Sequence, residues 1–590
     1  GFGEIQVGTI PQNVDRILVG YIERTRLQEI KVLFFLGVND GNIPKSGTGG
    51  GIISDIDREF LARGQWEMAP SPREQMYIQR LYLYMNMTKP RERLYLSYAR
   101  INGEGKAIRP AYLTGIVKKM FPKIKVEIPD REPLQEQVEI KEDGFGILAG
   151  QLREYARGNV LPMSFFFTLY RVYARDSDYR EKLERLVEAA FYRYQNSSLG
   201  RDIAHALYGS ILTCSVSRLE QYASCAYSYF LQYGLSLKER EQFVFEAVDM
   251  GNLFHSVLEQ FARLLEDRGI DWFSFSQDQG EALIEEAVDA QAALYGDNIL
   301  FSNARYLYVI TRIKRILKRT VFTLQNQLKK GKFLPEHFEV SFSRLTDVES
   351  VNISLSETEK MRLQGRIDRI DTCREEDTVY VKVIDYKSGN KKLDIAAVYY
   401  GLQLQLIVYM NAAVEMTGKK ETGKKAVPAA MLYYHVSDPL IRAEDDRMNE
   451  EDINEKIRES LRMNGIVNGR EDIIKRLDET FGDRSEVIPV ERKKDGSLSS
   501  RSGTLSDDEL QVLSKYVTKK IKTLGSQILQ GEIGKEPYAY GTETGCDYCA
   551  YRSVCGFNER IPGYEKKRLH DMTKEEALQK MQQEEQEGSR

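Results

Sequence analysis

Two consecutive stretches with strand character, joined by a short polar turn, constrain the fold of this chain most. MRLQGRIDRID precedes the turn CREED, and TVYVKVIDYK follows it. In the second stretch, Val381, Val383, Asp385 and Lys387 share one face at the period of a β-strand. An apolar face that ends in a carboxylate and an ammonium indicates either a surface ion pair at a strand end, which is the commoner case, or a reaction centre.

The register of this hairpin separates the two interpretations. If the chain turns at Glu376 and Asp377, Asp368 lies directly opposite Asp385, with Cβ atoms about 5 Å apart. Two carboxylates at that distance repel each other, and a divalent cation between them removes the repulsion. Oxygen ligands with open coordination positions favour Mg²⁺ or Mn²⁺. Lys387 then stands beside the metal, where it stabilises developing charge or orients a water, an arrangement suited to phosphodiester hydrolysis.

Length and composition set the broad class of protein. The chain has 590 residues, 42% hydrophobic and 29% charged, so we expect several globular domains. It has no run of about 18 apolar residues and no visible signal peptide, which predicts no membrane span. Six cysteines are too few for a disulfide scaffold, so a reduced, cytoplasmic setting is expected. A net charge of −4 does not exclude nucleic acid, because local basic patches govern phosphate contacts.

The N-terminal part of the chain predicts an α/β unit. The apolar run KVLFFLGV at 31–38 is typical of a buried parallel strand, and the turn-rich NDGNIPKSGTGGG follows it. A helix is expected around SPREQMYIQRLYLYMNMT and a second strand at RERLYLSYA. Residues 126–212 are expected to be a charged, mostly helical linker region, with a linker near EIPDREPLQEQVEIKEDG. The polar tail at 566–590 predicts a loose helix or disorder.

A second block of the sequence opens at residue 213. Ser217 and Glu220 predict a capping box for a helix in TCSVSRLEQYASCAYSYFLQYGL. The longer helix MGNLFHSVLEQFARLLEDRG has Gly269 at its C-cap and a stripe of residues expected to be buried. The members of this stripe are Leu253, Phe254, Val257, Leu258, Phe261, Leu264 and Leu265. His255 flanks the stripe, and a single histidine in such a place is more often solvated or at a core edge than a ligand.

The stretch after the Asp-x-Lys strand predicts a Tyr- and Gln-rich helix at 394–416, followed by the strand AAMLYYHV. Gln405 and Tyr409 are four residues apart on that helix and project together, which fits either a functional pair or ordinary packing at the edge of a core. Residues 441–515 are charged and give no clear assignment.

Three cysteines near the end of the chain form the pattern C-x2-C-x5-C. They are Cys546, Cys549 and Cys555, and such a pair in a reduced protein most often begins a zinc site. Three thiolates need a fourth ligand, and the remaining thiols are Cys214, Cys225 and Cys373.

Taken in order, these pieces resemble the RecB-type nucleases of the PD-(D/E)xK superfamily over residues 213–560. The matching segments are GNLFH, GRID, IDYK and QLIVY. The resemblance implies a nuclease domain with a mixed sheet flanked by helices. It also implies that His255, Asp368 and Asp385 bind Mg²⁺ or Mn²⁺, that Lys387 is catalytic, and that Gln405 and Tyr409 support the site and the DNA.

The segment SRLEQYASCAYSYFLQYGL resembles S-x-L-x-x-Y-x-x-C-P-x-x-F-x-x-Y of AddB-type iron–sulfur nucleases, with Ala226 in place of the usual proline. In that family one cysteine before the nuclease core and three after it hold a [4Fe–4S] cluster. The resemblance therefore implies Cys225, Cys546, Cys549 and Cys555 as ligands, in a staple that ties together the two ends of a nuclease domain at 213–565. Cys214 and Cys373 are then expected to be plain buried or turn residues.

The first block resembles the second motor domain of UvrD-like helicases, a RecA-like fold, in the diverged form found in AddB-type subunits. The matching segments are VLFFLGVNDGNIP and YMNMTKPRERLYLSYA, and they place a degenerate domain at 1–125. Lys89 and Pro90 follow the threonine where active motors carry an arginine, and the chain has no G-x-x-x-x-G-K-[ST] loop. We therefore expect no ATPase activity from this chain.

Together the two blocks resemble the C-terminal half of AddB-type subunits. This implies an exonuclease for the 5′-terminated strand of a double-strand DNA break, working beside an AddA-type helicase–nuclease in recombinational repair. Two alternatives remain. A freestanding Cas4-like single-strand nuclease is disfavoured by the helicase-like first block. A non-catalytic DNA-binding or assembly module is disfavoured by the intact set of Asp368, Asp385 and Lys387.

Overall fold

The computed structural model describes part of the chain, in two compact units, Gly1–Arg180 and Glu181–Arg590, which we treat separately. The described residues are 17–43, 61, 63–64, 70–103, 106–127, 134–159, 162–240, 245, 247–345, 347–389, 391–439 and 450–587. No helix in these ranges is both long and apolar enough to cross a membrane. The domain boundaries predicted after residues 125, 212 and 565 are not tested by the structure and remain predictions.

The first unit contains the predicted strand–helix–strand. Strand β1 (Ile30–Phe35) pairs in parallel with β2 (Pro90–Leu96), and helix α2 (Pro72–Met87) lies between them in the chain. Ser71 and Glu74 form the capping box that begins α2. Further helices follow: α3 (Tyr112–Met120), α4 (Lys141–Ala156) and α5 (Met163–Arg175). Helices α4 and α5 lie within the stretch predicted to be mostly helical, although Lys141 of the predicted linker already belongs to α4, and residues 128–133 of that linker lie outside the described residues.

The prediction that the first strand is buried is wrong for the described structure. Phe35 is buried, but Phe34 is 64% exposed and Leu36 is 72% exposed. Among the described residues β1 pairs with β2 alone, and the exposed Phe34 ring stacks on Tyr95 of β2. From residue 44 to residue 51, the predicted turn-rich stretch lies outside the described residues.

The second unit is built around a six-stranded mixed sheet with the order β11-β10-β9-β8-β7-β4. Its strands are β4 (Leu334–Ser341), β7 (Arg366–Arg374), β8 (Thr378–Lys387), β9 (Lys425–His435), β10 (Asn464–Asn468) and β11 (Thr504–Leu505). β7 runs antiparallel to both β4 and β8, whereas β8 runs parallel to β9. The mixed α/β character predicted for the nuclease block is confirmed.

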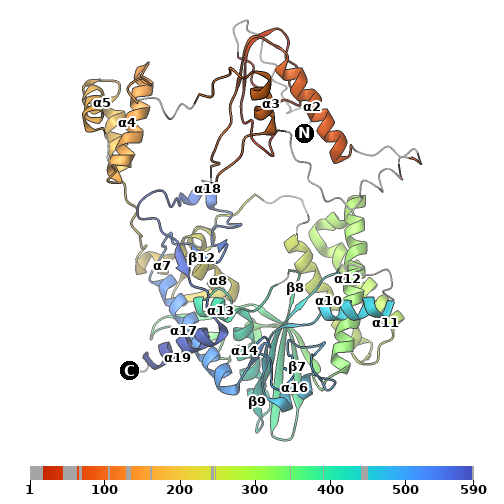
Figure 1. Ribbon diagram of the computed structural model, residues 1–590. Helices are drawn as coiled ribbons and strands as arrows, with labels where there is room; N and C mark the ends of the chain where they lie inside the picture. The colour runs from red at the N-terminus through yellow and green to blue at the C-terminus, as the bar shows by residue number, and fades with distance from the viewer. Residues whose placement is uncertain are drawn as a thin grey trace. The chain divides into compact units, whose positions relative to one another are not determined.

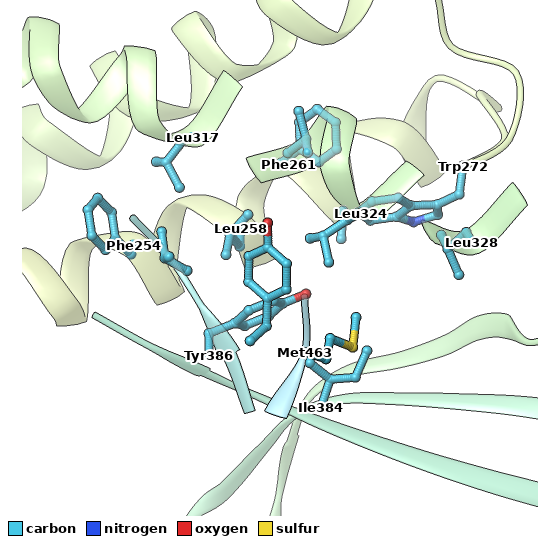
Figure 2. Packing of buried hydrophobic residues seen from close by; sticks show 14 of the residues in the cluster. Phe254, Leu258, Phe261, Trp272, Leu317, Leu324, Leu328, Ile384, Tyr386 and Met463 are labelled. Carbon is cyan, nitrogen blue, oxygen red and sulfur yellow. The ribbon is translucent and has the colours of Figure 1, made fainter. Parts of the chain in front are cut away.

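Helices cover both faces of this sheet (Figure 1). One face packs against α10 (Ala247–Asp267), α11 (Gln277–Leu294) and α12 (Ala304–Lys329). All seven residues of the predicted stripe on α10 are buried, and Gly269, just beyond the helix, has φ +63°. Figure 2 shows Phe254, Leu258 and Phe261 of this stripe with residues of α12 and with Ile384 and Tyr386 of β8.

The other face packs against helices that are far apart in the sequence. They are α8 (Val216–Ser224), α13 (Ile395–Tyr400), α14 (Gln405–Lys420), α17 (Asp507–Leu529) and α19 (Lys574–Glu587). Helix α19 lies in the tail for which a loose helix or disorder was predicted. Disorder is the wrong prediction for residues 574–587, because Ala577, Leu578 and Met581 are buried in this core.

Shorter elements complete the unit. α6 (Arg180–Ala190) and α7 (Arg201–Tyr208) lead into a small sheet of order β3-β6-β5, made of β3 (Ile211–Ser215), β5 (Asn352–Ser354) and β6 (Lys360–Gln364). α9 (Ala226–Tyr229) follows α8, and α15 (Glu450–Ser460) and α16 (Glu471–Leu477) flank β10. A third sheet, of order β13-β12-β14, contains β12 (Tyr538–Tyr540), β13 (Glu543–Thr544) and β14 (Lys567–Leu569), and α18 (Arg552–Cys555) lies between β13 and β14.

Two predicted elements are divided at a glycine. MRLQGRIDRID is two strands, β6 and β7, in different sheets, because Gly365 between them has φ +153°. The predicted helix at 394–416 is α13 and α14, separated at Gly401, which has φ +85°. Backbone conformations of this kind suit glycine, which has no Cβ. The division at Gly401 starts α14 at Gln405 and so determines where the Gln405 and Tyr409 side chains project.

Candidate metal and catalytic site

The predicted register of the β7–β8 hairpin is confirmed. Arg369 pairs with Ile384 and Ile370 with Val383, so the next position places Asp368 opposite Asp385. Both carboxylates are buried, with 7% exposure for Asp368 and 1% for Asp385. Asp368 Oδ2 accepts a hydrogen bond of 2.7 Å from the Tyr386 backbone N–H, which fixes one carboxylate against the neighbouring strand.

A third carboxylate, Glu339, lies next in the row, and the sequence analysis missed it. On β4, Phe338 pairs with Arg369 and Val340 with Ile367, so Glu339 stands opposite Asp368. Its backbone has φ +48°, which is unusual for a residue other than glycine. Burial, followed by the charge of Asp368, raises the pKa of Glu339 to about 7. β5 and β6 separate β4 from β7 in the chain, so no hairpin pattern in the sequence indicated this pairing.

His255 reaches the same carboxylates from helix α10. Its Nδ1 lies 3.3 Å from Asp368 Oδ2 and 3.9 Å from Glu339 Oε1. Ligand atoms of His255, Glu339 and Asp368 all lie within 4.8 Å of one another. Burial works against the charged imidazole, but the hydrogen bond and the charge of Asp368 outweigh it and raise the pKa of His255. The structure thus places the histidine beside the acidic residues rather than at a plain core edge.

Lys387 connects the carboxylates to helix α14. Its Nζ lies 2.6 Å from Asp385 Oδ2 and donates a hydrogen bond of 3.1 Å to Gln405 Oε1. Gln405 Nε2 in turn donates to Tyr409 Oη at 2.8 Å. The predicted joint projection of Gln405 and Tyr409 is therefore confirmed. Because Gln405 bonds to both neighbours, it fixes the direction of the lysine amine.

Glu220 supports this arrangement from helix α8, and the capping box predicted for it with Ser217 is wrong. Ser215 caps α8 instead, through a bond from the Arg218 backbone N–H. Glu220 Oε1 accepts bonds from the backbone N–H groups of Leu404 at 2.6 Å and Gln405 at 3.1 Å. Its carboxylate therefore holds the first turn of α14, which carries Gln405. Such a contact between residues distant in sequence leaves no local pattern to detect.

The electrostatics of the site favour a cation. Burial, followed by the neighbouring Asp368, raises the pKa of Asp385 to about 7, although Lys387 acts in the opposite direction. Glu339 has a raised pKa for the same reasons. Carboxylate oxygens and one imidazole nitrogen, crowded together and poorly neutralised, fit a divalent cation such as Mg²⁺ or Mn²⁺. The residues present are thus chemically suited to the metal that the sequence predicts.

The four cysteines of the predicted cluster line one small cavity. Cys225 comes from the junction of α8 and α9, while Cys546, Cys549 and Cys555 come from the segment after β13. Gly545 permits this approach, because a Cβ there would lie 2.9 Å from the Ser224 carbonyl oxygen.

Among the described residues, no three cysteine sulfurs lie within 4.8 Å of one another. Cys214 and Cys373 are buried outside the cavity, as predicted.

Comparisons with known proteins agree with this geometry. The family model described as the PD-(D/E)XK nuclease superfamily matches residues 213–556. Proteins that are named as one subunit of an ATP-dependent helicase/deoxyribonuclease, the AddB type, match nearly the whole chain. The one from Lachnoclostridium phytofermentans is 38% identical over 586 residues, 98% of this chain and 49% of that protein. That from Clostridium acetobutylicum is 35% identical over 581 residues, 98% of this chain and 50% of that protein.

The similar protein from Alkaliphilus oremlandii is 34% identical over 587 residues, 99% of this chain and 51% of its own length. The chain therefore spans about half the length of the curated relatives it matches. Their shared name confirms the resemblance to AddB-type subunits that the sequence predicts.

Proposed function

Because this chain belongs to the PD-(D/E)XK nuclease superfamily, we propose that its second unit hydrolyses phosphodiester bonds of DNA with a bound divalent metal ion. The observation that carries the proposal is the convergence of Asp368 and Asp385 from paired strands, with Lys387 Nζ 2.6 Å from Asp385. An isolated surface ion pair would not be buried between two further acids and a histidine.

Each side chain has a role that follows from its position. His255, Asp368, Asp385 and the newly identified Glu339 would hold Mg²⁺ or Mn²⁺. When bound, such an ion would polarise the phosphate and activate a water for attack. Lys387 faces the same place and stabilises negative charge that develops on the phosphate oxygens.

Gln405 keeps the Lys387 amine in place, and Tyr409 supports Gln405. Gln405, which is partly exposed, could also contact the DNA, whereas Tyr409 is buried and would act through Gln405.

The names of the relatives support a more specific role. Similarity runs through 98–99% of this chain, the helicase-like first block included. We accordingly assign the chain to the exonuclease that degrades the 5′-terminated strand at a double-strand break, in a heterodimer with an AddA-type helicase–nuclease. The 1–125 block serves as a degenerate motor domain without ATPase activity, which binds the DNA backbone and the partner.

We also propose a [4Fe–4S] cluster at Cys225, Cys546, Cys549 and Cys555. The support is that the four thiols line one cavity although three of them lie more than 300 residues beyond the first. A single zinc ion is the second candidate, favoured by the C-x2-C pair.

The decisive experiment compares single-stranded DNA digestion in Mg²⁺ or Mn²⁺ by the wild-type chain and by Asp385→Asn. We expect the substitution to lower the rate by at least about 100-fold, because it removes the negative charge that would bind the metal and that pairs with Lys387. The control is Asp377→Asn, an exposed acid in the turn of the same hairpin, which should digest like wild type. Equal rates for Asp385→Asn and wild type would remove the nuclease assignment from this site.

The same assay addresses the alternatives. Metal-dependent digestion that needs no partner, with no change on adding an AddA-type helicase–nuclease, would favour the freestanding nuclease. DNA binding without any digestion, alone or with the partner, would favour the non-catalytic module.

A further inference from the structure

A second feature lies beside the candidate metal site, an open cleft of about 510 Å³ between the segment that joins β8 to α14 and the β12–β13 hairpin. Its volume falls in the range of about 300–1,000 Å³ that is usual for small-molecule sites. Lys391, Asp394, Leu402 and Gln403 line one side, contributed by the segment between β8 and α14. Tyr538, Tyr540, Thr542 and Glu543 of the hairpin line the other, together with Asp571.

The lysine end of the cleft adjoins the candidate catalytic site. Lys391 Nζ and Lys387 Nζ each lie 5.7 Å from the ring centroid of the same residue, Tyr433. Tyr433 pairs in register with Asp385 across β8 and β9. Gln403, two residues before Gln405, accepts a bond from the Asp394 backbone N–H and so joins the cleft wall to the start of α14. A strand whose phosphate lies at Lys387 can therefore place a neighbouring phosphate at Lys391.

The other end of the cleft is aromatic and acidic. Tyr538 and Tyr540 are two residues apart on β12 and are both partly exposed. Tyr540 Oη lies 2.9 Å from Asp394 Oδ2 and 3.2 Å from Asp571 Oδ1, which holds the ring against the wall. The carboxylates beside the tyrosines, Asp394, Glu543 and Asp571, repel phosphate, and Lys391 is the only basic residue among the described residues that line the cleft. The charges thus assign phosphate to the Lys391 end and an uncharged base to the tyrosine end.

From this arrangement we infer that the cleft is a nucleotide subsite for single-stranded DNA. Lys391 binds the phosphate next to the scissile one, and the ring of Tyr538 stacks on the base attached to it. Stacking on a tyrosine face accepts any base, so the subsite positions the strand without reading its sequence. This inference rests on the proposed function, because it takes the strand that is cleaved as its ligand.

A cross-linking experiment locates the base directly. A short single-stranded oligonucleotide with one 5-iododeoxyuridine is irradiated with the full chain, with Ca²⁺ in place of Mg²⁺ to prevent cleavage. We expect a cross-linked peptide that contains Tyr538 or Tyr540. Cross-links found only in other peptides, wherever the iodinated base stands in the oligonucleotide, would overturn the subsite.

Matched substitutions test the two ends separately. Tyr538→Ala should raise both the KM for short single strands and their Kd by roughly 5- to 150-fold, since one stacked base is lost, with little change in kcat. Tyr538→Phe keeps the ring and should behave like wild type. Lys391→Gln should lower the salt dependence of binding by about 0.7 in the log–log slope, the value for one phosphate contact on a single strand. Lys392→Gln, which changes the exposed neighbour, should leave that slope unchanged.

The binding and cleavage measurements can refute the subsite and the nuclease assignment separately. If wild type and variants cleave alike and bind alike, the subsite is refuted while the nuclease assignment stands. If no digestion occurs but Tyr538→Ala and Lys391→Gln weaken oligonucleotide binding, the cleft is a binding site for single-stranded DNA, while the nuclease assignment and the placement next to a scissile phosphate fall. Thermal melting of each variant identifies loss of folding, and if Tyr538→Ala unfolds, the cross-linking of the wild-type chain and the salt dependence of Lys391→Gln still test the subsite.

Discussion

At the scale of single residues, the site is defined by acids that are hard to keep ionised without a cation. Asp385 is 1% exposed and faces Asp368, and Glu339 faces Asp368 from the other side. Burial and these neighbours raise the pKa of both Asp385 and Glu339 to about 7. The metal-free fold is thus under electrostatic strain at neutral pH, a cost that active sites commonly impose on stability.

This strain predicts a pH dependence of stability. Unfolded Asp and Glu have pKa values of about 3.9 and 4.3. A carboxyl group with a higher pKa in the folded state stabilises the fold fully below its unfolded pKa, and this contribution is lost as pH rises through the folded pKa. His255, whose pKa is also raised, acts in the same direction. We therefore expect the Tm of the metal-free chain to fall from about pH 4 to pH 8.

The check is thermal melting in a chelator at several pH values. Asp385→Asn should flatten the pH dependence and melt higher than wild type at pH 8, although it abolishes digestion. Asp377→Asn should melt in parallel with wild type. Parallel curves for wild type and Asp385→Asn would contradict the raised pKa of Asp385.

The sequence predicted residues of this site where the chain brings them together locally. Asp368 and Asp385 follow from counting residues across one turn, and Lys387 and the pair Gln405 and Tyr409 follow from period and motif. Glu339 and Glu220 could not be predicted, because their partners lie in strands or helices far along the chain. Long-range pairing of this kind has no signature in hydrophobic periodicity.

At the scale of elements, the β7–β8 hairpin has a buried ionic network on the face opposite to the carboxylate pair. Arg369 and Asp371 are fully buried, with Arg369 Nε 2.6 Å from Asp371 Oδ1 and Lys382 Nζ 2.7 Å from Asp371 Oδ2. The ring of Trp272 lies 5.1 Å from the Arg369 guanidinium. A slip of one residue would turn every side chain to the other face and leave these charges unpaired. The network thereby helps to keep Asp368 opposite Asp385.

The contact between helices α8 and α14 yields a second prediction. Glu220→Ala leaves the N–H groups of Leu404 and Gln405 without their acceptor, at a cost of roughly 1–3 kcal/mol for such a buried group. Because Gln405 then no longer holds Lys387 firmly, we expect a lower kcat with unchanged metal affinity. Glu220→Gln keeps an acceptor oxygen and should lose less.

The matched control is Ser217→Ala, which removes the hydroxyl that was predicted to cap α8. It should leave kcat and Tm close to wild type, because Ser215 provides that cap. If Glu220→Ala loses metal affinity by the same factor as kcat, Glu220 does not act only through Gln405 and Lys387, and this prediction is contradicted.

For most elements, the sequence predicted whether the segment is a helix or a strand better than it predicted where the element begins and ends. The stripe of α10, the strands of the hairpin and the first strand–helix–strand follow from periodicity. The divisions at Gly365 and Gly401 were missed, because a glycine in a periodic stretch is compatible with both a continuous and a broken element. The β10–β11 edge of the sheet was unassigned, since its strands are short and set among charged residues.

At the scale of the whole second unit, segments from its two ends meet at the cysteine cavity. Cys225 follows α8 near the start, whereas the other three cysteines follow β13 near the end. The same β12–β13 hairpin lines the nucleotide cleft, with Cys546 three residues beyond Glu543. A metal group at the cysteines would therefore fix the hairpin that forms the cleft wall.

This connection predicts the behaviour of cysteine variants. The wild-type chain purified without oxygen should be brown, with iron and sulfide near four of each per chain, as a [4Fe–4S] group requires. Cys225→Ala should lose the colour, melt at lower temperature and bind single-stranded DNA more weakly. Cys214→Ala, a buried cysteine outside the cavity, should keep the colour. Colourless wild-type protein with one zinc per chain would contradict the cluster and favour the zinc site.

The domain organisation and the burial of the terminal segments were only partly predictable from the sequence. Composition indicated several domains, and the polar pattern of the tail left both a loose helix and disorder open. Burial of Ala577, Leu578 and Met581 was not predictable, since three apolar residues in a Glu- and Gln-rich stretch give no strong periodic signal. The exposure of Phe34 and Leu36 likewise depends on what packs against their side chains, which the apolar sequence does not specify.

The most direct measurement is a crystal structure of the chain soaked in Mn²⁺, with anomalous scattering used to locate the ion. We expect one strong peak among Asp368, Asp385, Glu339 and His255, with the Lys387 amine beside it, and no such peak in Asp385→Asn. A Mn²⁺ ion bound elsewhere, with the two aspartates facing apart, would contradict the proposed metal-dependent site.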